Sequence, residues 1–372
     1  MRAGILTAFN APNYGTVLQC YALQQTLENK GINVTIIDYT PSSVDLHWST
    51  FPFILFRNEK SLKGKLIIIC KFFLFLSFRI QRRRKFAKFI AQQFKMSKKK
   101  FNSKSDFKND DYDWYIVGSD QMWSKKIFGM DDIYWGNFPK SPNTRLATYA
   151  NSTGDTEQFN PSDIEYIRHS LRNFSAIGVR EDVLNQFISE LTDQKVTTVL
   201  DPTLLLKKEA YDHLAIEPKI KGKYILIYRI GDNSLIDKMA EIAAKRYNAK
   251  IVEIGNSMVT HRIKHPKYIQ CTPSVGEFLG FFKNATCIFS KSFHGLVFSL
   301  IFRRQFYVGE SDIMDRVNNL LNIVGLNNRV ITEKNIATIT FDEINYNTIE
   351  KRLNPHITLS NAFIDDILKT EL

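Results

Sequence analysis

Near the end of the chain, the fold is decided by the stretch ATCIFSKSFHGLVFSLIF, which covers residues 285–302. Residues 285–289 are apolar and predict a buried strand, and residues 296–302 predict a buried helix. The polar turn between them carries hydroxyls, a lysine and a histidine. Because the first turn of a helix has unpaired N–H groups that favour an anion, we expect this turn to bind phosphate or carboxylate. In the alternative interpretation, His294 only caps the helix and Gly295 only relieves crowding.

The same alternation of strand and helix runs through the rest of the chain. Strands are predicted at 3–9, 34–39, 114–117, 145–150, 175–179, 197–200, 223–229 and 250–254, and helices at 14–29 and 234–247. Two consecutive halves of this kind predict an α/β fold of two Rossmann-like domains that face each other across a cleft. We expect residues 1–205 to form the first domain. Residues 206–372 should form the second, with the 285–302 stretch and the terminal helices.

Three polar residues follow predicted strand ends, where ligands bind in parallel sheets. These are Asp120, Arg180 and His294, which we expect to converge on the cleft. The loop after the first strand has a single glycine, Gly15, and so lacks the glycine-rich fingerprint of dinucleotide binding. No cofactor is expected.

The positive charge of the chain is concentrated in one segment. The formal net charge is +12, and residues 57–108 contain 17 Lys and Arg against two acidic residues. An apolar block at 66–78 is shorter than the roughly 20 residues that a bilayer span needs. We expect a basic helical insertion in the first domain over about residues 48–108, with a helical tail to Lys100. It either lies in the interface of an anionic leaflet or packs on its own domain with a solvated basic face.

Neither the cysteines nor the acidic residues predict a metal or redox centre. The four cysteines are Cys20, Cys70, Cys271 and Cys287, and no two of them form a C-x-x-C pair. Three of the four lie in apolar runs and are expected in the core. Asp111-Tyr112-Asp113 has a D-x-D spacing but precedes its strand, so we expect a turn. Nucleic-acid binding is not expected, because the basic run lacks a recognised binding fold. The apolar run at 3–9 is too short for a signal peptide, and we expect a cytoplasmic protein.

Six short motifs, in order along the chain, resemble the polysaccharide pyruvyl transferase family. They are NYGTVLQCYAL (13–23), VGSDQMW (117–123), YANSTG (149–154), VRED (179–182), LDPTLL (200–205) and SFHG (292–295). Each motif alone is short, but six in sequence identify the chain as a member. The family's fold, two Rossmann-like domains that resemble GT-B glycosyltransferases, agrees with the two α/β halves.

The resemblance implies that the enolpyruvyl carbon of phosphoenolpyruvate is transferred to a sugar of a cell-surface glycan or its lipid-linked precursor, forming a pyruvate ketal. This reaction needs protonation at C3, attack by a sugar hydroxyl at C2 and departure of phosphate. Cations would hold the donor, and titratable groups would move the protons. At the matching positions, the implied catalytic residues are His294 and Asp120. The implied donor-binding residues are Arg180, Ser292, Lys291, Gly295 and Arg316. The implied acceptor-binding residues are Asn13, Tyr14, Gly15, Gln121 and Trp123.

The sequence departs from the family pattern beside the histidine. Members with the best-defined donor site have a basic residue where Ser292 stands, so we expect Lys291 to supply the charge. An acidic residue is common at the position of Lys291 in relatives with the serine. In simpler interpretations, Asp120 is a helix cap and Arg316 is a surface residue.

The sequence leaves two rival functions open. The first is a GT-B glycosyltransferase that uses a nucleotide sugar, because the two folds share a cleft and an anion site. The second is a non-catalytic scaffold for glycan assembly, which the presence of Asp120, Arg180 and His294 disfavours. With a lipid-linked acceptor, the protein is expected on the inner face of the cell membrane, attached through residues 57–108.

Overall fold

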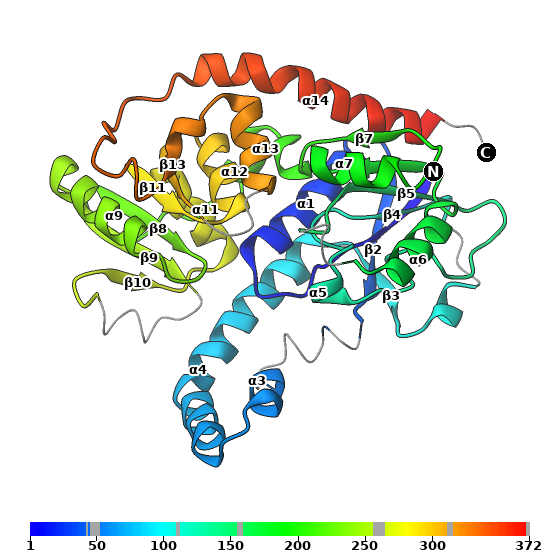
Figure 1. The fold of residues 1–372 in the computed structure, drawn as a ribbon, viewed down its shortest axis with the longest axis horizontal. Helices are drawn as coiled ribbons and strands as arrows, with labels where there is room; N and C mark the ends of the chain where they lie inside the picture. Colours follow the sequence, from blue (N-terminus) through cyan, green and yellow to red (C-terminus); the bar gives the residue numbers. More distant parts are fainter. Residues whose placement is uncertain are drawn as a thin grey trace. The chain divides into compact units, whose positions relative to one another are not determined.

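The computed structural model describes residues 1–41, 44, 53–108, 112–154, 159–255, 265–310 and 315–369. The chain forms two compact units, one of residues Met1–Leu205 with Ile357–Leu372 and the other of residues Leu206–His356 (Figure 1). Each unit is built on a parallel sheet with helices, so the predicted α/β class of two Rossmann-like units is confirmed. The start of the expected insertion, at residue 48, lies outside the described residues.

The sheet of the first unit has seven strands in the order β3-β2-β1-β4-β5-β6-β7, and every neighbouring pair is parallel. The strands are β1 (Arg2–Leu6), β2 (Asn33–Tyr39), β3 (Met96–Phe101), β4 (Trp114–Val117), β5 (Arg145–Asn151), β6 (Ala176–Val179) and β7 (Val196–Thr198). Strand β4 is buried along its whole length, as expected where helices cover both faces of a sheet. The order reverses between β1 and β4, the topological switch point at which such folds bind ligands.

The helices of the first unit are α1 (Tyr14–Glu28), α3 (Phe53–Asn58), α4 (Leu62–Gln93), α5 (Lys125–Phe128), α6 (Pro161–Leu171) and α7 (Asp182–Ser189), with short 3₁₀ turns η1 (Lys104–Phe107) and η2 (Pro202–Leu204). Helix α1 begins at a side-chain cap, since Asn13 Oδ1 accepts hydrogen bonds from the N–H groups of Gly15 and Thr16. Gly31, just beyond its end, has a φ of 80°, which suits glycine. Outside the basic segment, the predicted strands and the first helix of this unit match the structure to within about three residues.

Two expectations about the basic segment are wrong. The predicted helical tail to Lys100 ends instead at Gln93, and Met96–Phe101 forms the edge strand β3, with Lys98, Lys99 and Lys100 exposed. Lysines are typical of edge strands because they discourage pairing with another chain. Cys70 is exposed on α4, whereas Cys20 and Cys287 are buried as predicted.

The second unit repeats the same topology with six strands. Their order is β10-β9-β8-β11-β12-β13, again wholly parallel. The strands are β8 (Tyr224–Arg229), β9 (Lys250–Gly255), β10 (Ile269–Cys271), β11 (Cys287–Ser290), β12 (Gln305–Gly309) and β13 (Val330–Ile331), and the helices are α8 (Lys208–Asp212), α9 (Ser234–Tyr247), α11 (Val275–Asn284), α12 (Phe293–Ile301) and α13 (Asp315–Val324), with the turn η3 (Asn327–Arg329). The switch point here lies between β8 and β11.

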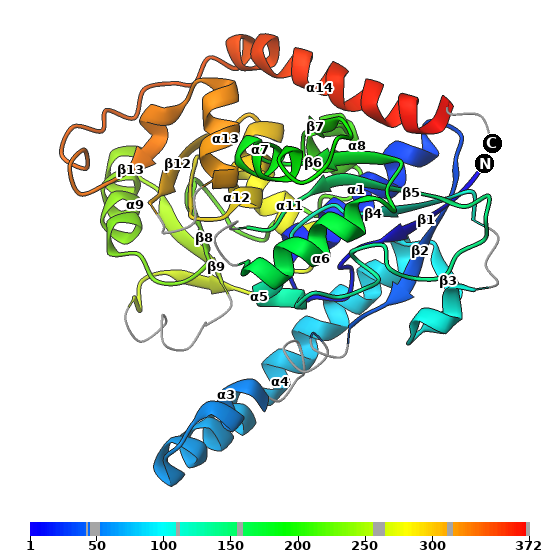
Figure 2. The same cartoon turned by 45° about the vertical axis from the view of Figure 1, so that its right-hand side comes forward.

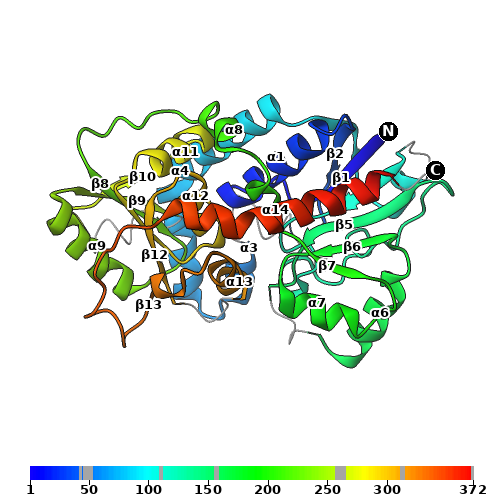
Figure 3. The same ribbon diagram turned by 90° about the horizontal axis from the view of Figure 1, so that it is seen from above.

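The last helix, α14 (Tyr346–Lys369), belongs to both units (Figure 3). In its second half, Ser360 Oγ accepts a hydrogen bond from Leu200 N at 2.9 Å, and Asp365 pairs with Lys30 at 2.6 Å. The Phe363 ring lies 6.3 Å from that of Tyr149 on β5. The expectation that the terminal helices belong wholly to the second domain is therefore corrected, because residues 357–369 pack on the first unit.

Candidate active site

Strand β4 of the first unit ends in a turn that places Asp120 at the switch point. Gly118 in this turn has a φ of 122°, and a Cβ there would lie 2.2 Å from the carbonyl oxygen of Tyr149, so only glycine fits. Asp120 itself has a φ of 79°, and its carbonyl oxygen accepts a hydrogen bond from Ser152 N at 3.0 Å. This bond ties the turn to the end of β5.

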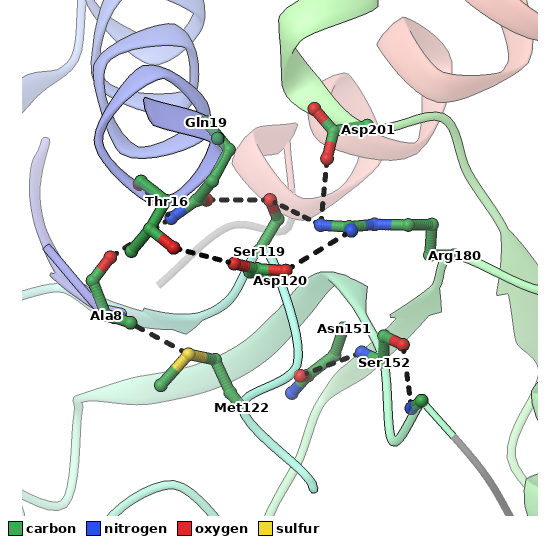
Figure 4. Close-up of polar contacts among 12 residues, drawn as sticks. Ala8, Thr16, Gln19, Ser119, Asp120, Met122, Asn151, Ser152, Arg180 and Asp201 are labelled. Carbon is green, nitrogen blue, oxygen red and sulfur yellow. Dashed lines mark hydrogen bonds and ion pairs between the residues drawn. The ribbon is translucent and has the colours of Figure 1, made fainter. Parts of the chain in front are cut away.

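The Asp120 carboxylate is held from two sides (Figure 4). Its Oδ2 accepts a hydrogen bond from Thr16 Oγ1 at 3.3 Å, and its Oδ1 lies 3.5 Å from a guanidinium nitrogen of Arg180. The side chain of Asp120 is 15% exposed, whereas that of Arg180 is 3% exposed. Asp120 therefore reaches the surface from a group that is otherwise buried.

Arg180 follows β6 and is surrounded by acceptors of its own chain. Its NH2 atom lies 2.8 Å from Asp201 Oδ2 and donates to Ser119 Oγ at 3.1 Å. Burial alone would lower the pKa of Arg180, but the negative charges of Asp201, Asp120 and Glu181 raise it above the usual arginine value. Carboxylates of its own chain thus already engage the charge of Arg180, and its contact with the donor stays a prediction.

Gln19 joins the ends of β1 and β4 through the same network. Its Oε1 accepts a hydrogen bond from Ser119 Oγ at 2.7 Å, and its Nε2 lies 3.1 Å from Thr7 Oγ1 and 2.9 Å from the carbonyl oxygen of Thr16. Thr16, Gln19, Ser119 and Asp201 were not predicted as site residues. The signal that would have found them is their position inside the six motifs, next to residues that were chosen.

The network carries more negative than positive charge. Asp120, Asp201 and Glu181 stand against the single cation of Arg180, and Asp201 and Glu181 are buried. An anionic donor is disfavoured beside such a group, whereas sugar hydroxyls donate readily to carboxylates. This surface of the first unit therefore suits an acceptor better than a donor.

The residues expected to bind the acceptor fall into two groups. Asn13 is exposed, Gly15 donates to its cap, and Gln121 packs against Gly154, whose Cβ would lie 1.9 Å from Gln121 Nε2. Tyr14, in contrast, is buried with its ring 5.0 Å from Phe86.

Trp123 belongs to the core of the first unit. It is fully buried, stacks on Trp135 with a centroid separation of 4.6 Å, and its Nε1 donates to the carbonyl oxygen of Tyr134 at 2.9 Å. The expectation that Trp123 contacts the acceptor is corrected, because an indole buried in this way has a packing role.

The SFHG motif of the second unit lies in a strand–turn–helix, as predicted, but α12 begins at Phe293, so His294 and Gly295 lie in the helix and not in the turn. Strand β11 ends at Ser290, whose Oγ donates to the carbonyl oxygen of Tyr228 at 2.8 Å and accepts from Ser292 N at 3.0 Å. A Cβ on Gly295 would lie 2.5 Å from Ser290 Oγ, so this glycine lets the helix approach the strand end. The turn thus lies at the switch point beside β8, as Asp120 does in the first unit.

In the second unit, Arg316 lies next to Phe293, the residue that precedes His294. His294 is the second residue of α12 and is 7% exposed. The Arg316 guanidinium, from α13, lies 5.8 Å from the centre of the Phe293 ring. Arg316 is thus placed next to the motif instead of standing alone on a helix surface, and Lys291 is half-buried in the turn.

No metal site occurs among the described residues, which hold no suitable group of three or more His, Cys, Asp or Glu side chains. Asp111 of the D-x-D sequence lies outside them, and Asp113 accepts a hydrogen bond from Arg2 N at 2.6 Å. Nor does any described helix combine the length and apolar character required to cross a bilayer.

Several solved structures are similar to this chain at low identity. The UDP-GlcNAc 2-epimerase of Methanocaldococcus jannaschii is 12% identical with a TM-score of 0.48, and each chain is covered completely. That of Rickettsia bellii is 11% identical with a TM-score of 0.49, covering 99% of this chain and 96% of its own. The E. coli heptosyltransferase WaaC with ADP is 9% identical with a TM-score of 0.41, covering 96% and 100%.

No curated protein matches the chain. The family model for polysaccharide pyruvyl transferase matches residues 13–308, which is most of the chain and includes all six motifs. Both switch points, with Asp120 and His294 beside them, lie inside the matched range. The chain belongs to the polysaccharide pyruvyl transferase family.

Proposed function

We propose that this protein transfers the pyruvyl group of phosphoenolpyruvate to a sugar of a surface polysaccharide or its precursor, forming a cyclic pyruvate ketal. Family membership supports a transferase of this class. The observation that carries the assignment of the site is Asp120, a carboxylate that reaches the surface from a buried network at the switch point.

The reaction joins one donor to two hydroxyl groups of the sugar. The CH2 carbon of the donor takes one proton and becomes a methyl group. C2 forms two C–O bonds to the sugar and loses the bond to phosphate, so the double bond is consumed without any oxidation. Of the two hydroxyl protons, one balances the proton added at C3 and the other leaves with phosphate.

In this proposal the first unit binds the acceptor. Asp120 accepts the proton of the attacking hydroxyl. Asn13 and Gly15, at the start of α1, and Gln121, next to Asp120, contact the sugar. Arg180 serves as a positioning residue, because its contacts with Asp201 and Ser119 fix the guanidinium that faces Asp120. Thr16 orients the second carboxylate oxygen.

The second unit binds the donor. Lys291 and Arg316 supply positive charge for the phosphate and carboxylate of phosphoenolpyruvate, and the N–H groups at the start of α12 add hydrogen bonds. Ser292 stands at the cap of α12, and Gly295 keeps that helix close to the strand end. His294 protonates C3 or contacts the phosphate. That His294 and Asp120 act across one cleft is part of the proposal.

The acceptor is proposed to be a lipid-linked oligosaccharide at the inner face of the cell membrane. The basic segment at residues 57–108 supports this location, because it attracts an anionic surface.

A coupled assay tests the proposed reaction. The purified protein is incubated with phosphoenolpyruvate and a glycolipid extract of the source cells, and released phosphate is measured together with the mass of the glycolipids. We expect phosphate release that requires the extract, and a sugar product heavier by one pyruvate less one water. Transfer from a nucleotide sugar in the same extract, with no phosphate released from phosphoenolpyruvate, would contradict the proposal.

A further inference from the structure

Helix α4 of the first unit divides into two halves with different surroundings (Figure 2). Residues 82–93 pack on α1, where the buried rings of Phe86 and Phe89 lie 5.0 Å from Tyr14 and 6.1 Å from Tyr21. Residues 62–80 extend away from the sheet of this unit. Only the second half of the helix is therefore held by the core.

The extended half carries an unusual amount of exposed apolar surface. Twelve large apolar side chains are exposed in the described part of the chain, and six of them lie between residues 62 and 80: Leu62, Leu66, Ile67, Phe73, Leu74 and Ile80. Leu62 is 86% exposed, and Phe73 and Leu74 are more than two-thirds exposed. Single exposed apolar residues are ordinary, but six in one helical segment indicate an interaction surface.

The charge of α4 identifies the partner. Nine Lys and Arg residues and no Asp or Glu lie between Leu62 and Gln93. A partner that buries the apolar side chains must also neutralise this one-signed charge. An anionic lipid surface offers both, with acyl chains for the leucines and phenylalanines and headgroups for the lysines. With lysines at positions 63, 65 and 71, the helix would lie in the interface and not cross it.

We propose that residues 62–80 bind the surface of an anionic bilayer, with Leu66, Phe73 and Leu74 inserted among the lipids. The docked half then joins this anchor to the candidate site. Arg82 NH2 donates to the carbonyl oxygen of Pro12 at 2.7 Å, one residue before Asn13, and its guanidinium lies 5.8 Å from the centre of the Tyr14 ring. In this arrangement Asn13 and Tyr14, which are expected to bind the acceptor, are held beside the membrane. This last step rests on the proposed function, whereas the docking itself does not.

The basic cluster 82–85 is a poor place to test this proposal. Arg82 donates a hydrogen bond to the carbonyl oxygen of Pro12. Arg83 is partly buried, and this burial, together with the nearby charge of Arg79, lowers its pKa. Substitution of either arginine would therefore disturb packing. The exposed residues 66, 73 and 74 are better, since none of them is held by the core. A matched control is Ile216→Ser with Ile242→Ser and Leu359→Ser, three exposed apolar residues elsewhere in the chain.

The experiment is co-sedimentation of the full chain with vesicles of phosphatidylcholine alone or with phosphatidylglycerol, at about 0.1 M and about 1 M salt. Neither donor nor acceptor is present. We expect binding to the anionic vesicles that high salt weakens, because screening shortens the range of the lysine charges. The affinity of the triple variant Leu66→Ser, Phe73→Ser, Leu74→Ser for the anionic vesicles should fall by about tenfold or more. The matched control should bind as the wild type does.

Two outcomes would overturn the proposal. One is that the wild-type protein does not bind anionic vesicles at low salt, even if it transfers pyruvate to a soluble acceptor. The other is a triple-serine variant that binds as well as the wild type. Sedimentation velocity without lipid completes the test: a dimer lost in the triple-serine variant, together with absent vesicle binding, would assign the apolar face to a second copy of the chain.

Discussion

The guanidinium of Arg180 lies 2.8 Å from the carboxylate of Asp201, and both side chains are buried. Asp201 also accepts a hydrogen bond from Thr203 N at 2.9 Å, which begins η2. The pair therefore ties the ends of β6 and β7 together, and through Ser119 it fixes the turn that carries Asp120.

Breaking this pair should be costly for stability. We expect Asp201→Asn to lower the free energy of unfolding by about 3–5 kcal/mol, because Arg180 would lose its closest counter-charge while buried. Urea denaturation measures the change. As a control, Glu350→Gln removes the exposed partner of Arg303 and should cost about 0–1 kcal/mol. Equal losses for the two variants would show that the buried pair does not hold the site.

Asp120→Asn should separate chemistry from folding. Asparagine tolerates the positive φ of this position and keeps the shape of the side chain, so the melting temperature should change little. It cannot accept the hydroxyl proton, and transfer should fall by about 10²–10⁴-fold. Asp182→Asn, at the start of α7, is the control and should keep its activity. A fully active Asp120→Asn protein would remove Asp120 from the mechanism.

Gly295→Ala should damage the SFHG turn. The new Cβ would lie 2.5 Å from Ser290 Oγ and 2.7 Å from Ser290 Cβ, so the helix or the strand end must shift. We expect a loss of about 1–3 kcal/mol, typical of overpacking, and weaker donor binding, because Ser290 also holds Ser292 N. Thermal denaturation and donor titration measure the two effects. Unchanged values in both would mean that the turn accommodates a larger residue.

Stability should depend on pH through Asp163 at the start of α6. Burial raises its pKa, but hydrogen bonds from Lys125 and from Asn160 N outweigh burial, and the net pKa is lowered from the usual 3.8. A lowered pKa adds stability that is present above pH 3.8 and lost as the pH falls through the folded-state value. Asp163→Asn should therefore melt below the wild type at pH 7, and the difference should shrink at low pH. A constant difference would contradict this origin.

The order of strands and helices was predictable because parallel strands covered on both faces are continuous apolar runs. The 285–302 stretch shows this best, since a strand, a turn and a helix form in the predicted order, although the helix begins at Phe293 and takes in His294 and Gly295, which were expected in the turn. The basic segment was harder. Met96–Phe101 has a charged pattern that suits either a helix surface or an edge strand, and only pairing with β2 decides between them.

The roles of the candidate site residues stay predictions. Asp120 and His294 could be chosen because each follows a strand end. The burial of Trp123 and the carboxylate partners of Arg180 could not, because they depend on contacts between residues far apart in the sequence, such as Trp123 with Trp135 and Arg180 with Asp201. That Arg180 and His294 face one cleft stays a prediction.

Ligand-dependent thermal denaturation tests most directly whether phosphoenolpyruvate is the donor. At 100 times its dissociation constant, a ligand of the folded state stabilises by about 2.7 kcal/mol. We predict that phosphoenolpyruvate raises the melting temperature of the wild type, and that Arg316→Gln reduces this shift. Stabilisation by a nucleotide sugar, with none by phosphoenolpyruvate at any concentration, would show that phosphoenolpyruvate is not the donor and favour a glycosyltransferase.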